Sequence, residues 1–193
     1  MTGFRFCDEG DYGFGWIAEE KLRRASHALA ADGRVWLVDP VEWPEAEDRA
    51  RSLGDIAGVV QLLDRHNRDA AAIAQRLGIP HLRLGVPGPF ARIDVVNIPR
   101  WREVALWWPA RRILVCADAL GTIDGYFTVP GEPIGVHPLL RLTPPRRLAA
   151  RDPEHVLVGH GEGVHEAASG AVRDAVRTAR RGLPSIVRAM IRR

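Results

Sequence analysis

The sequence has few cysteines, no long apolar run and no apolar leader, and each of these shortages excludes a class of protein. Its 193 residues include only Cys7 and Cys116, which lie far apart and form no CxxC or zinc-ribbon spacing. No run of eighteen apolar residues is present, and residues 1–12 carry charges in place of a signal core. We therefore expect a cytoplasmic protein with reduced thiols and no membrane association.

Lysine is also nearly absent, since Lys21 is the only one and the other basic residues are arginines. The net charge is only +3, but arginines thicken near the C-terminus, at Arg173, Arg177, Arg180, Arg181, Arg188, Arg192 and Arg193. Such a face is able to attract phosphates or anionic lipid. No aromatic residues interleave with these arginines, as single-strand nucleic-acid binding would require. We therefore interpret them as the solvated face of a terminal helix.

The pattern of apolar residues favours one α/β domain spanning residues 1–193, because short apolar runs alternate with helical patterns and no linker is visible. The expected strands are 35–38, 58–63, 79–84, 93–98, 103–108, 113–117 and 155–158. Helices are expected at 45–53, at 69–77 with Asn67 as a candidate cap, and at 166–181 within a basic segment of about 166–193. Pro184 is expected to end this last helix before a short turn at 186–191, and residues 122–145 are expected to be irregular.

Four separated segments carry the motifs of the chain. The first is 35–40, a strand ending in Asp39-Pro40, and the second is 59–80, a strand, loop and helix containing Arg65-His66-Asn67-Arg68-Asp69-Ala70. The third is 113–121, a strand followed by Asp118, and the fourth is 156–161, which ends in Gly159-His160-Gly161. In this order the segments resemble the metallo-β-lactamase-fold hydrolases. The resemblance implies a short version of their four-layer αββα sandwich, with the loop at 65–70 in the place of their His-x-His-x-Asp-His motif.

The resemblance also implies that the family's metal centre is degraded. Arg65, Asn67 and Ala70 stand at the positions of the motif's three histidines, and no histidine lies within 85–112. Asp69 matches the motif's aspartate, Asp118 the metal-bridging aspartate and His160 the last metal histidine. Asp69, Asp118 and His160 are therefore the candidate ligands if a metal is bound, with Asp69 also the candidate catalytic residue. His66 occupies a spacer position and is expected to point elsewhere.

The charge of Arg65 bears on whether a metal binds. A guanidinium about 4 Å from a dication costs roughly 8 kcal/mol at an effective dielectric of about 20. The same group would gain by pairing with Asp69 or Asp118 if the metal were absent. We therefore expect no cofactor, and the alternative is one divalent ion of zinc, iron or manganese.

Three functional hypotheses follow. The first is a non-hydrolytic binding or regulatory protein that takes a small-molecule ligand in the former active-site cleft, with His66 and His137 as candidate pocket residues. The alternative is a divergent mononuclear hydrolase of an ester, thioester or phosphoester. A second alternative is nucleic-acid binding, which we consider a poor fit. A homodimer through the C-terminal helix or the 122–145 loop is compatible with the pattern, and His155 and His165 are expected to act independently of His160.

Overall fold

The computed structural model describes residues 3–66 and 68–191. Its first sheet has six strands in chain order: β1 (Phe4–Gly10), β2 (Gly13–Ala18), β3 (Ala25–Ala31), β4 (Arg34–Val38), β5 (Asp55–Gln61) and β6 (His81–Arg83). The second sheet has the order β12-β9-β8-β7, formed by β7 (Ala91–Ile98), β8 (Trp101–Trp108), β9 (Ile113–Cys116) and β12 (His155–Val158). A two-stranded sheet pairs β10 (Leu120–Gly121) with β11 (Gly135–Val136).

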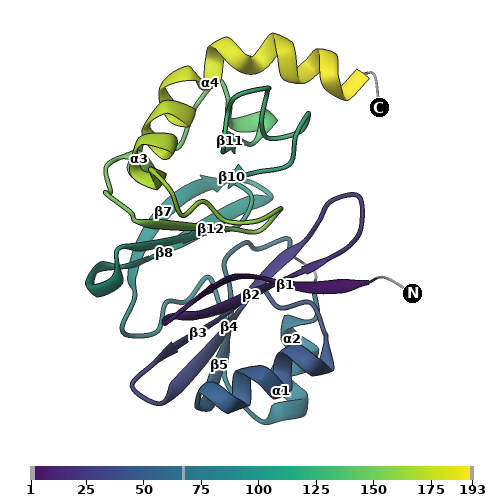
Figure 1. Cartoon of the computed structure of the whole chain (residues 1–193), viewed down its shortest axis with the longest axis vertical. Coiled ribbons are helices and arrows are strands. Elements are labelled where there is room, and N and C mark those ends of the chain that lie inside the picture. Colours follow the sequence, from purple (N-terminus) through teal and green to yellow (C-terminus); the bar gives the residue numbers. More distant parts are fainter. Residues whose placement is uncertain (1–2, 67, 192–193) are drawn as a thin grey trace.

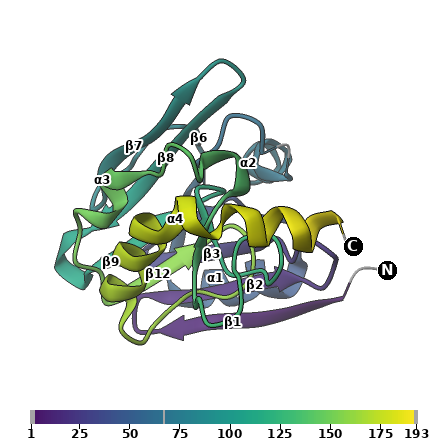
Figure 2. The ribbon, with the colours of Figure 1, turned by 90° about the horizontal axis from the view of Figure 1, so that it is seen from above.

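Helices cover the two outer faces of the paired sheets (Figures 1 and 2). On the first sheet lie α1 (Pro44–Leu53) and α2 (Ala70–Leu77), and on the second lie α3 (Arg146–Ala149) and α4 (Ala168–Ile191). The short 3-10 turns η1 (Pro109–Arg111) and η2 (Pro138–Leu140) complete the elements. The layers therefore run helix, sheet, sheet, helix, and this confirms the αββα fold class expected from the sequence.

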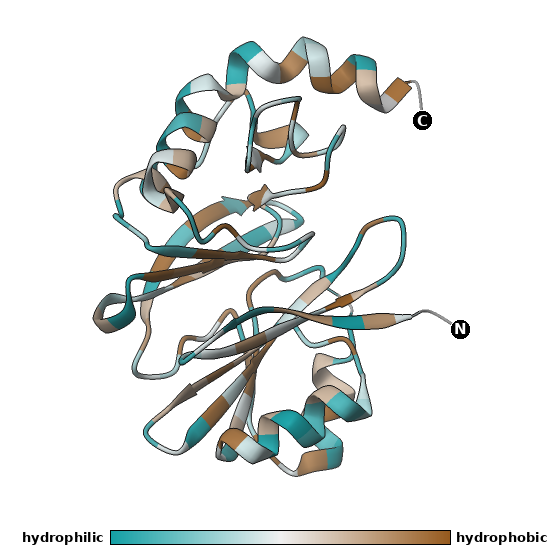
Figure 3. Cartoon of the chain, in the orientation of Figure 1, coloured by the Kyte–Doolittle hydropathy of each residue, from teal (hydrophilic) through white to brown (hydrophobic). Residues whose placement is uncertain are grey.

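Two apolar clusters hold these layers together. The larger joins the facing sheets to α4, and it includes Leu29, Val60, Leu106, Leu157 and Val172. A smaller cluster packs α1 and α2 on the outer face of the first sheet. In Figure 3 the strands between the helical layers carry long brown stretches interrupted by pale and teal ones, whereas the outer helices alternate brown with teal. A strand buried on both faces reads as a continuous apolar run, and this explains why β9 and β12 could be predicted from sequence.

The three N-terminal strands were not predicted from the sequence. β1, β2 and β3 form an antiparallel meander that leads into β4. β2 is buried along its whole length although it begins with glycines. Gly13 has φ of 130°, and a Cβ there would lie 1.9 Å from the carbonyl oxygen of Ala28. Glycine is thus required by close backbone approach, so the meander lacks the β-branched composition that predicts strands.

Helix ends also differ from the sequence expectation. The N-cap residue of α2 is Asp69, and the predicted cap Asn67 lies outside the described residues. The prediction that Pro184 ends the last helix was wrong, because α4 continues through it to Ile191. Proline removes one helical hydrogen bond and favours a bend, and α4 does bend along its course (Figure 1). Among the described residues, no helix is both long and apolar enough to cross a membrane.

The long segment 122–145 is mostly irregular, as expected, but it is firmly anchored. Arg141 is only 1% exposed, and its guanidinium donates hydrogen bonds to the carbonyl oxygens of Phe127, Val136 and Ala179. Ala179 belongs to α4, so one buried side chain ties the segment to the helix above it. The segment therefore forms a fixed wall beside the ends of β9 and β12.

Candidate metal centre

Four side chains meet where parallel strands end. β4 pairs with β5, and β9 pairs with β12, both in parallel, so the carboxyl ends of each pair share one edge. Asp39 follows β4 directly, and His66 lies on the loop between β5 and α2. Asp118 and His160 each lie two residues beyond their strands, β9 and β12. The fold thus gathers these residues from four distant parts of the chain.

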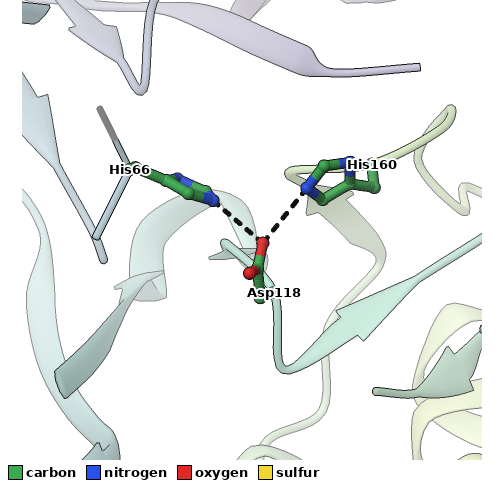
Figure 4. Close-up of side chains that lie close together, drawn as sticks. All are labelled: His66, Asp118 and His160. Atoms are coloured by element: carbon green, nitrogen blue, oxygen red, sulfur yellow. Dashed lines mark hydrogen bonds and ion pairs between the residues drawn. The ribbon is translucent and has the colours of Figure 1, made fainter. Parts of the chain in front are cut away.

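His66, Asp118 and His160 form the centre of this group. One oxygen of Asp118, Oδ1, lies 2.9 Å from Nε2 of His66 and 3.2 Å from Nε2 of His160. Figure 4 shows both imidazole rings pointing at this oxygen from opposite sides. Ligand atoms of the three residues all lie within 4.8 Å of one another. Their side chains keep 9%, 13% and 12% of their surface exposed, so solvent reaches the group.

The far nitrogen of each ring faces a second acceptor. Nδ1 of His160 lies 2.7 Å from the backbone oxygen of Leu22, and Nδ1 of His66 lies 3.2 Å from Oδ2 of Asp39. The hydrogen bond to Leu22 holds the ring proton of His160 on Nδ1, whereas the contact of His66 with Asp39 is an ion-pair distance without hydrogen-bond geometry. The Nε2 lone pair of His160 then points at Asp118, and His66 has the same orientation when its Nδ1 carries the proton. This is the arrangement in which metal-ligating histidines are usually oriented.

The charged groups shift one another's proton affinity. Burial disfavours the carboxylate of Asp118, but its contacts with His160 and His66 outweigh this and hold its pKa well below the usual range. Burial and the charge of Arg68 disfavour protonated His66, but Asp39 and Asp118 outweigh them, so the pKa of His66 is raised. The centre therefore keeps an ionised carboxylate and attracts positive charge, whether a proton or a metal ion.

Arg65 lies at the exposed rim of the centre. Its guanidinium is 3.7 Å from Oδ2 of Asp118 and stacks 4.0 Å from the ring centre of Trp101. The side chain is 42% exposed, so water screens its charge and the repulsion of a dication is much weaker than expected for a buried arginine. The expected contact between Arg65 and Asp118 is present, but the guanidinium is also exposed to water.

Arg68 has a different position, turned toward the strand ends. Its guanidinium donates to the backbone oxygens of Ala25, Asp39 and Gly159, at 2.5, 2.9 and 2.9 Å. These oxygens belong to β3 and to the ends of β4 and β12. Arg68 therefore joins the two sheets beside the centre, and its charge is distributed over three carbonyl dipoles.

The expectation that His66 points elsewhere was wrong. The loop turns His66 and Arg68 inward, and Arg65 outward onto Trp101, so the inward-facing positions are displaced by one residue from those inferred from the motif. Asp69 is not in the group of three, because its Oδ2 accepts a hydrogen bond from the backbone N–H of Glu42 at 2.8 Å. Asn67 lies outside the described residues, and Ala70 is the buried first residue of α2.

His137 lies behind Trp101 and is almost fully buried. Its Nδ1 accepts from the backbone N–H of Leu139, so its Nε2 carries the proton and donates to the hydroxyl of Tyr126 at 3.2 Å. Burial lowers the pKa of His137 to about 4. This neutral ring supports the wall of the site.

Sequence reasoning did not find two supporting carboxyl groups. Asp39 was assigned only to a turn, although it contacts His66. Glu103 is fully buried, and its oxygens accept from the backbone N–H of Ala119 and from Nε1 of Trp101. Burial, and then the charge of Asp118, raise its pKa to about 7. A buried polar residue inside an apolar strand was the only available signal for Glu103.

The three central residues fit a divalent ion. Both nitrogens of His160 lie close to oxygen acceptors, and the same is true of His66. A neutral imidazole carries only one N–H and cannot donate to two acceptors. Two protonated rings would satisfy these acceptors, but with ring centres 6.1 Å apart they would repel by about 3 kcal/mol at an effective dielectric of about 20. A cation beside both Nε2 atoms and Asp118 satisfies the same acceptors without that repulsion. Two imidazoles and one carboxylate suit zinc, iron or manganese.

Solved structures share this architecture at low sequence identity. A metallo-β-lactamase from Erythrobacter litoralis aligns with a TM-score of 0.59 and 10% identity, covering 92% of this chain and 94% of its own. One from Pontibacter korlensis aligns with a TM-score of 0.59 and 10% identity over 91% and 99% of the two chains. The DIM-1 metallo-β-lactamase exposed to ceftazidime aligns with a TM-score of 0.57 and 12% identity over 93% and 99%.

The chain has the metallo-β-lactamase fold. No family model and no curated protein matches the sequence. At such low identity the likeness shows the architecture alone, and the residues of the site have to be argued from this chain. Within the metallo-β-lactamase fold of this protein, His66, Asp118 and His160 occupy the edge where both parallel strand pairs end.

Proposed function

We propose that this protein is a mononuclear metal-dependent hydrolase whose single divalent ion is held by His66, Asp118 and His160. The observation that carries the proposal is the pair of histidines that share one oxygen of Asp118 while their Nδ1 atoms face Asp39 and the backbone oxygen of Leu22. When bound, such an ion acts as a Lewis acid and lowers the pKa of a coordinated water to about 7.

The chain's own residues orient and protect this centre. Asp39 and the backbone oxygen of Leu22 fix the two imidazole rings, and Glu103 holds the backbone at Ala119, next to Asp118. Arg68 fixes the strand ends beneath them. A centre held by such outer contacts keeps its ligands in one geometry, which supports metal affinity.

Arg65 supplies the argument for the substrate class. Its guanidinium lies at the rim, is 42% exposed and rests on Trp101. A planar guanidinium at the mouth of a site recognises carboxylates and phosphates through paired hydrogen bonds. We therefore propose a small anionic substrate, an ester, thioester or phosphoester whose negative group is bound by Arg65.

The second candidate is a metal-free binding or regulatory protein. The contact between Arg65 and Asp118, at 3.7 Å, favours it, as does the raised pKa of His66. In that state protonated His66 and Arg65 neutralise Asp118 and Asp39, and the same cleft binds a small ligand without hydrolysis.

Metal content separates the two candidates. Untagged protein purified without chelator should contain at least one zinc, iron or manganese ion per chain by elemental analysis, one of them held by this centre. Asp118→Asn and His160→Gln should lose this ion, whereas Asp69→Asn, an identical chemical change on the neighbouring loop, should keep it. Near-zero metal in the wild type, with metal gained by Arg65→His, would support the metal-free candidate and refute the hydrolase.

The activity is tested next with the metal-loaded protein. Anionic ester, thioester and phosphoester substrates should be hydrolysed by the wild type and not by Asp118→Asn. Arg65→Met should raise KM for the anionic substrates more than it lowers kcat, because it removes binding of the negative group. A metal-loaded protein that hydrolyses none of the three classes would refute the catalytic part of the proposal.

A further inference from the structure

A second cluster of polar side chains lies at the other end of β12. His155 begins this strand and His160 follows its end, so the two histidines are on the order of 15 Å apart along an extended chain. His155 and His165 both line a cavity of about 590 Å³ beside the start of α4. Asp8, from β1, reaches this cluster from the other sheet.

Asp8 is held in an unusual conformation. Its φ is 50°, a left-handed value, and it lies in an irregularity of the β1–β2 pairing between Cys7 and Gly10. The side chain is only 2% exposed, and Oδ1 accepts from the backbone N–H of Gly163 at 2.8 Å. Bulges often redirect one side chain, and backbone strain is frequently found at functional sites. Here the bulge turns a carboxylate inward, toward His165.

The carboxylate sets the orientation of His165. Nε2 of His165 lies 2.9 Å from Oδ1 of Asp8. Burial disfavours the carboxylate of Asp8, but its contacts with His165, His27 and the backbone of Gly163 outweigh burial and lower its pKa. Asp8 is therefore ionised and accepts the proton on Nε2 of His165. The Nδ1 lone pair of His165 then faces Nδ1 of His155, at 3.1 Å. When both rings are neutral, Nδ1 of His155 carries a proton and donates it to Nδ1 of His165. A carboxylate behind one histidine nitrogen is the common outer partner of a metal-binding histidine.

We propose that His155 and His165 form a second metal site, which takes one zinc, nickel or copper ion through their Nδ1 atoms with Asp8 as the positioning residue. The two Nδ1 atoms are 3.1 Å apart, so an ion about 2.1 Å from both would have an N–metal–N angle of about 95°. This angle suits two adjacent ligand positions. Binding needs only the transfer of the His155 proton from Nδ1 to Nε2. Water completes the shell from the cavity.

The neighbouring charges are balanced enough to admit a cation. Glu154 lines the same cavity and offers a carboxylate, although it pairs with Arg112 at 2.7 Å. Arg173 also lines the cavity, but it is paired with Asp152 at 3.5 Å and is 54% exposed. The ring of Tyr12 packs against His155 in a tilted arrangement, with ring centres 5.3 Å apart.

Calorimetric titration of the chelator-treated full chain with zinc tests this site. The wild type should bind two ions, and His165→Gln and His155→Gln should each bind one. The Asp118→Asn/His160→Gln variant should also bind one, because it leaves only one histidine at the other centre, and the same variant with His165→Gln added should bind none. His81→Gln, a change at a histidine that contacts Gln61, is the matched control and should bind two.

Spectroscopy and the Asp8→Asn variant test the geometry and the positioning role. Copper bound to the Asp118→Asn/His160→Gln variant should show coupling to two imidazole nitrogens, reduced to one when His155→Gln is added. Asp8→Asn should keep the stoichiometry but weaken this site by about 10- to 100-fold. The proposal is overturned if zinc stoichiometry is the same in wild type, His155→Gln and His165→Gln, all folded by circular dichroism. An unchanged affinity in folded Asp8→Asn would remove Asp8 from the site.

Discussion

Replacing Asp39 with asparagine tests the role of the outer contacts at the proposed metal centre. Oδ1 of Asp39 accepts from the backbone N–H of Leu62 at 3.1 Å, whereas Oδ2 faces Nδ1 of His66 at 3.2 Å. In Asp39→Asn the amide oxygen keeps the bond to Leu62, so the amide NH₂ faces His66. Asp39 has φ of 44°, a conformation that asparagine also adopts readily, so the backbone should not change.

The substitution should reverse the tautomer of His66. Two donors cannot face each other, so the ring proton moves to Nε2 and is donated to Asp118. A protonated Nε2 cannot bind a metal ion. Metal affinity should therefore fall by about 10- to 100-fold, which is about 1.4 to 2.7 kcal/mol.

Affinity is measured by competition with a chromophoric chelator, after circular dichroism has shown that the variant is folded. Asp69→Asn is the matched control, because its carboxylate accepts from the backbone N–H of Glu42 and an amide oxygen can do the same. An affinity within twofold of the wild type in Asp39→Asn would refute the orienting role. An equal loss in Asp69→Asn would show that the effect is not specific to His66.

Two further predictions concern stability. Arg141→Met removes the guanidinium hydrogen bonds to three backbone carbonyl oxygens and should lower the free energy of unfolding by about 3 to 5 kcal/mol in urea, whereas exposed Arg146→Met should change it by less than about 0.5 kcal/mol. Equal effects of the two arginine variants would contradict the anchoring of residues 122–145. Burial raises the pKa of Glu103 to about 7, so the folded state favours its protonated form. This contribution to stability is complete below the pKa of Glu103 in the unfolded chain and is lost as pH rises through about 7. The total loss is about 3 kcal/mol. Urea unfolding at pH 5 and pH 8.5 should show this loss in the wild type and not in Glu103→Gln, and an identical pH dependence in both would refute it.

The sequence was most informative where a local pattern has one structural meaning. The apolar run 155–158 coincides with β12, and 35–38 lies within β4. The N-terminal meander was missed because small residues and glycines carry its close backbone contacts, and these have little strand propensity. Pro184 was expected to end a helix, but in α4 the burial of Ile186 beyond it favours continued helix over the lost hydrogen bond.

By itself, the sequence determined the layered α/β architecture and the position of two candidate site residues. Asp118 and His160 lie two residues beyond buried strands, so parallel pairing of β9 and β12 brings them to one edge. Only the tertiary structure decided that His66 joins them, because the loop after β5 has no regular period and its side-chain directions depend on what it packs against. The same holds for Asp39 and Asp8, whose roles arise from contacts with residues 27 and 157 positions away in the chain. Local patterns fix where strands end, whereas long-range packing fixes which atoms meet there.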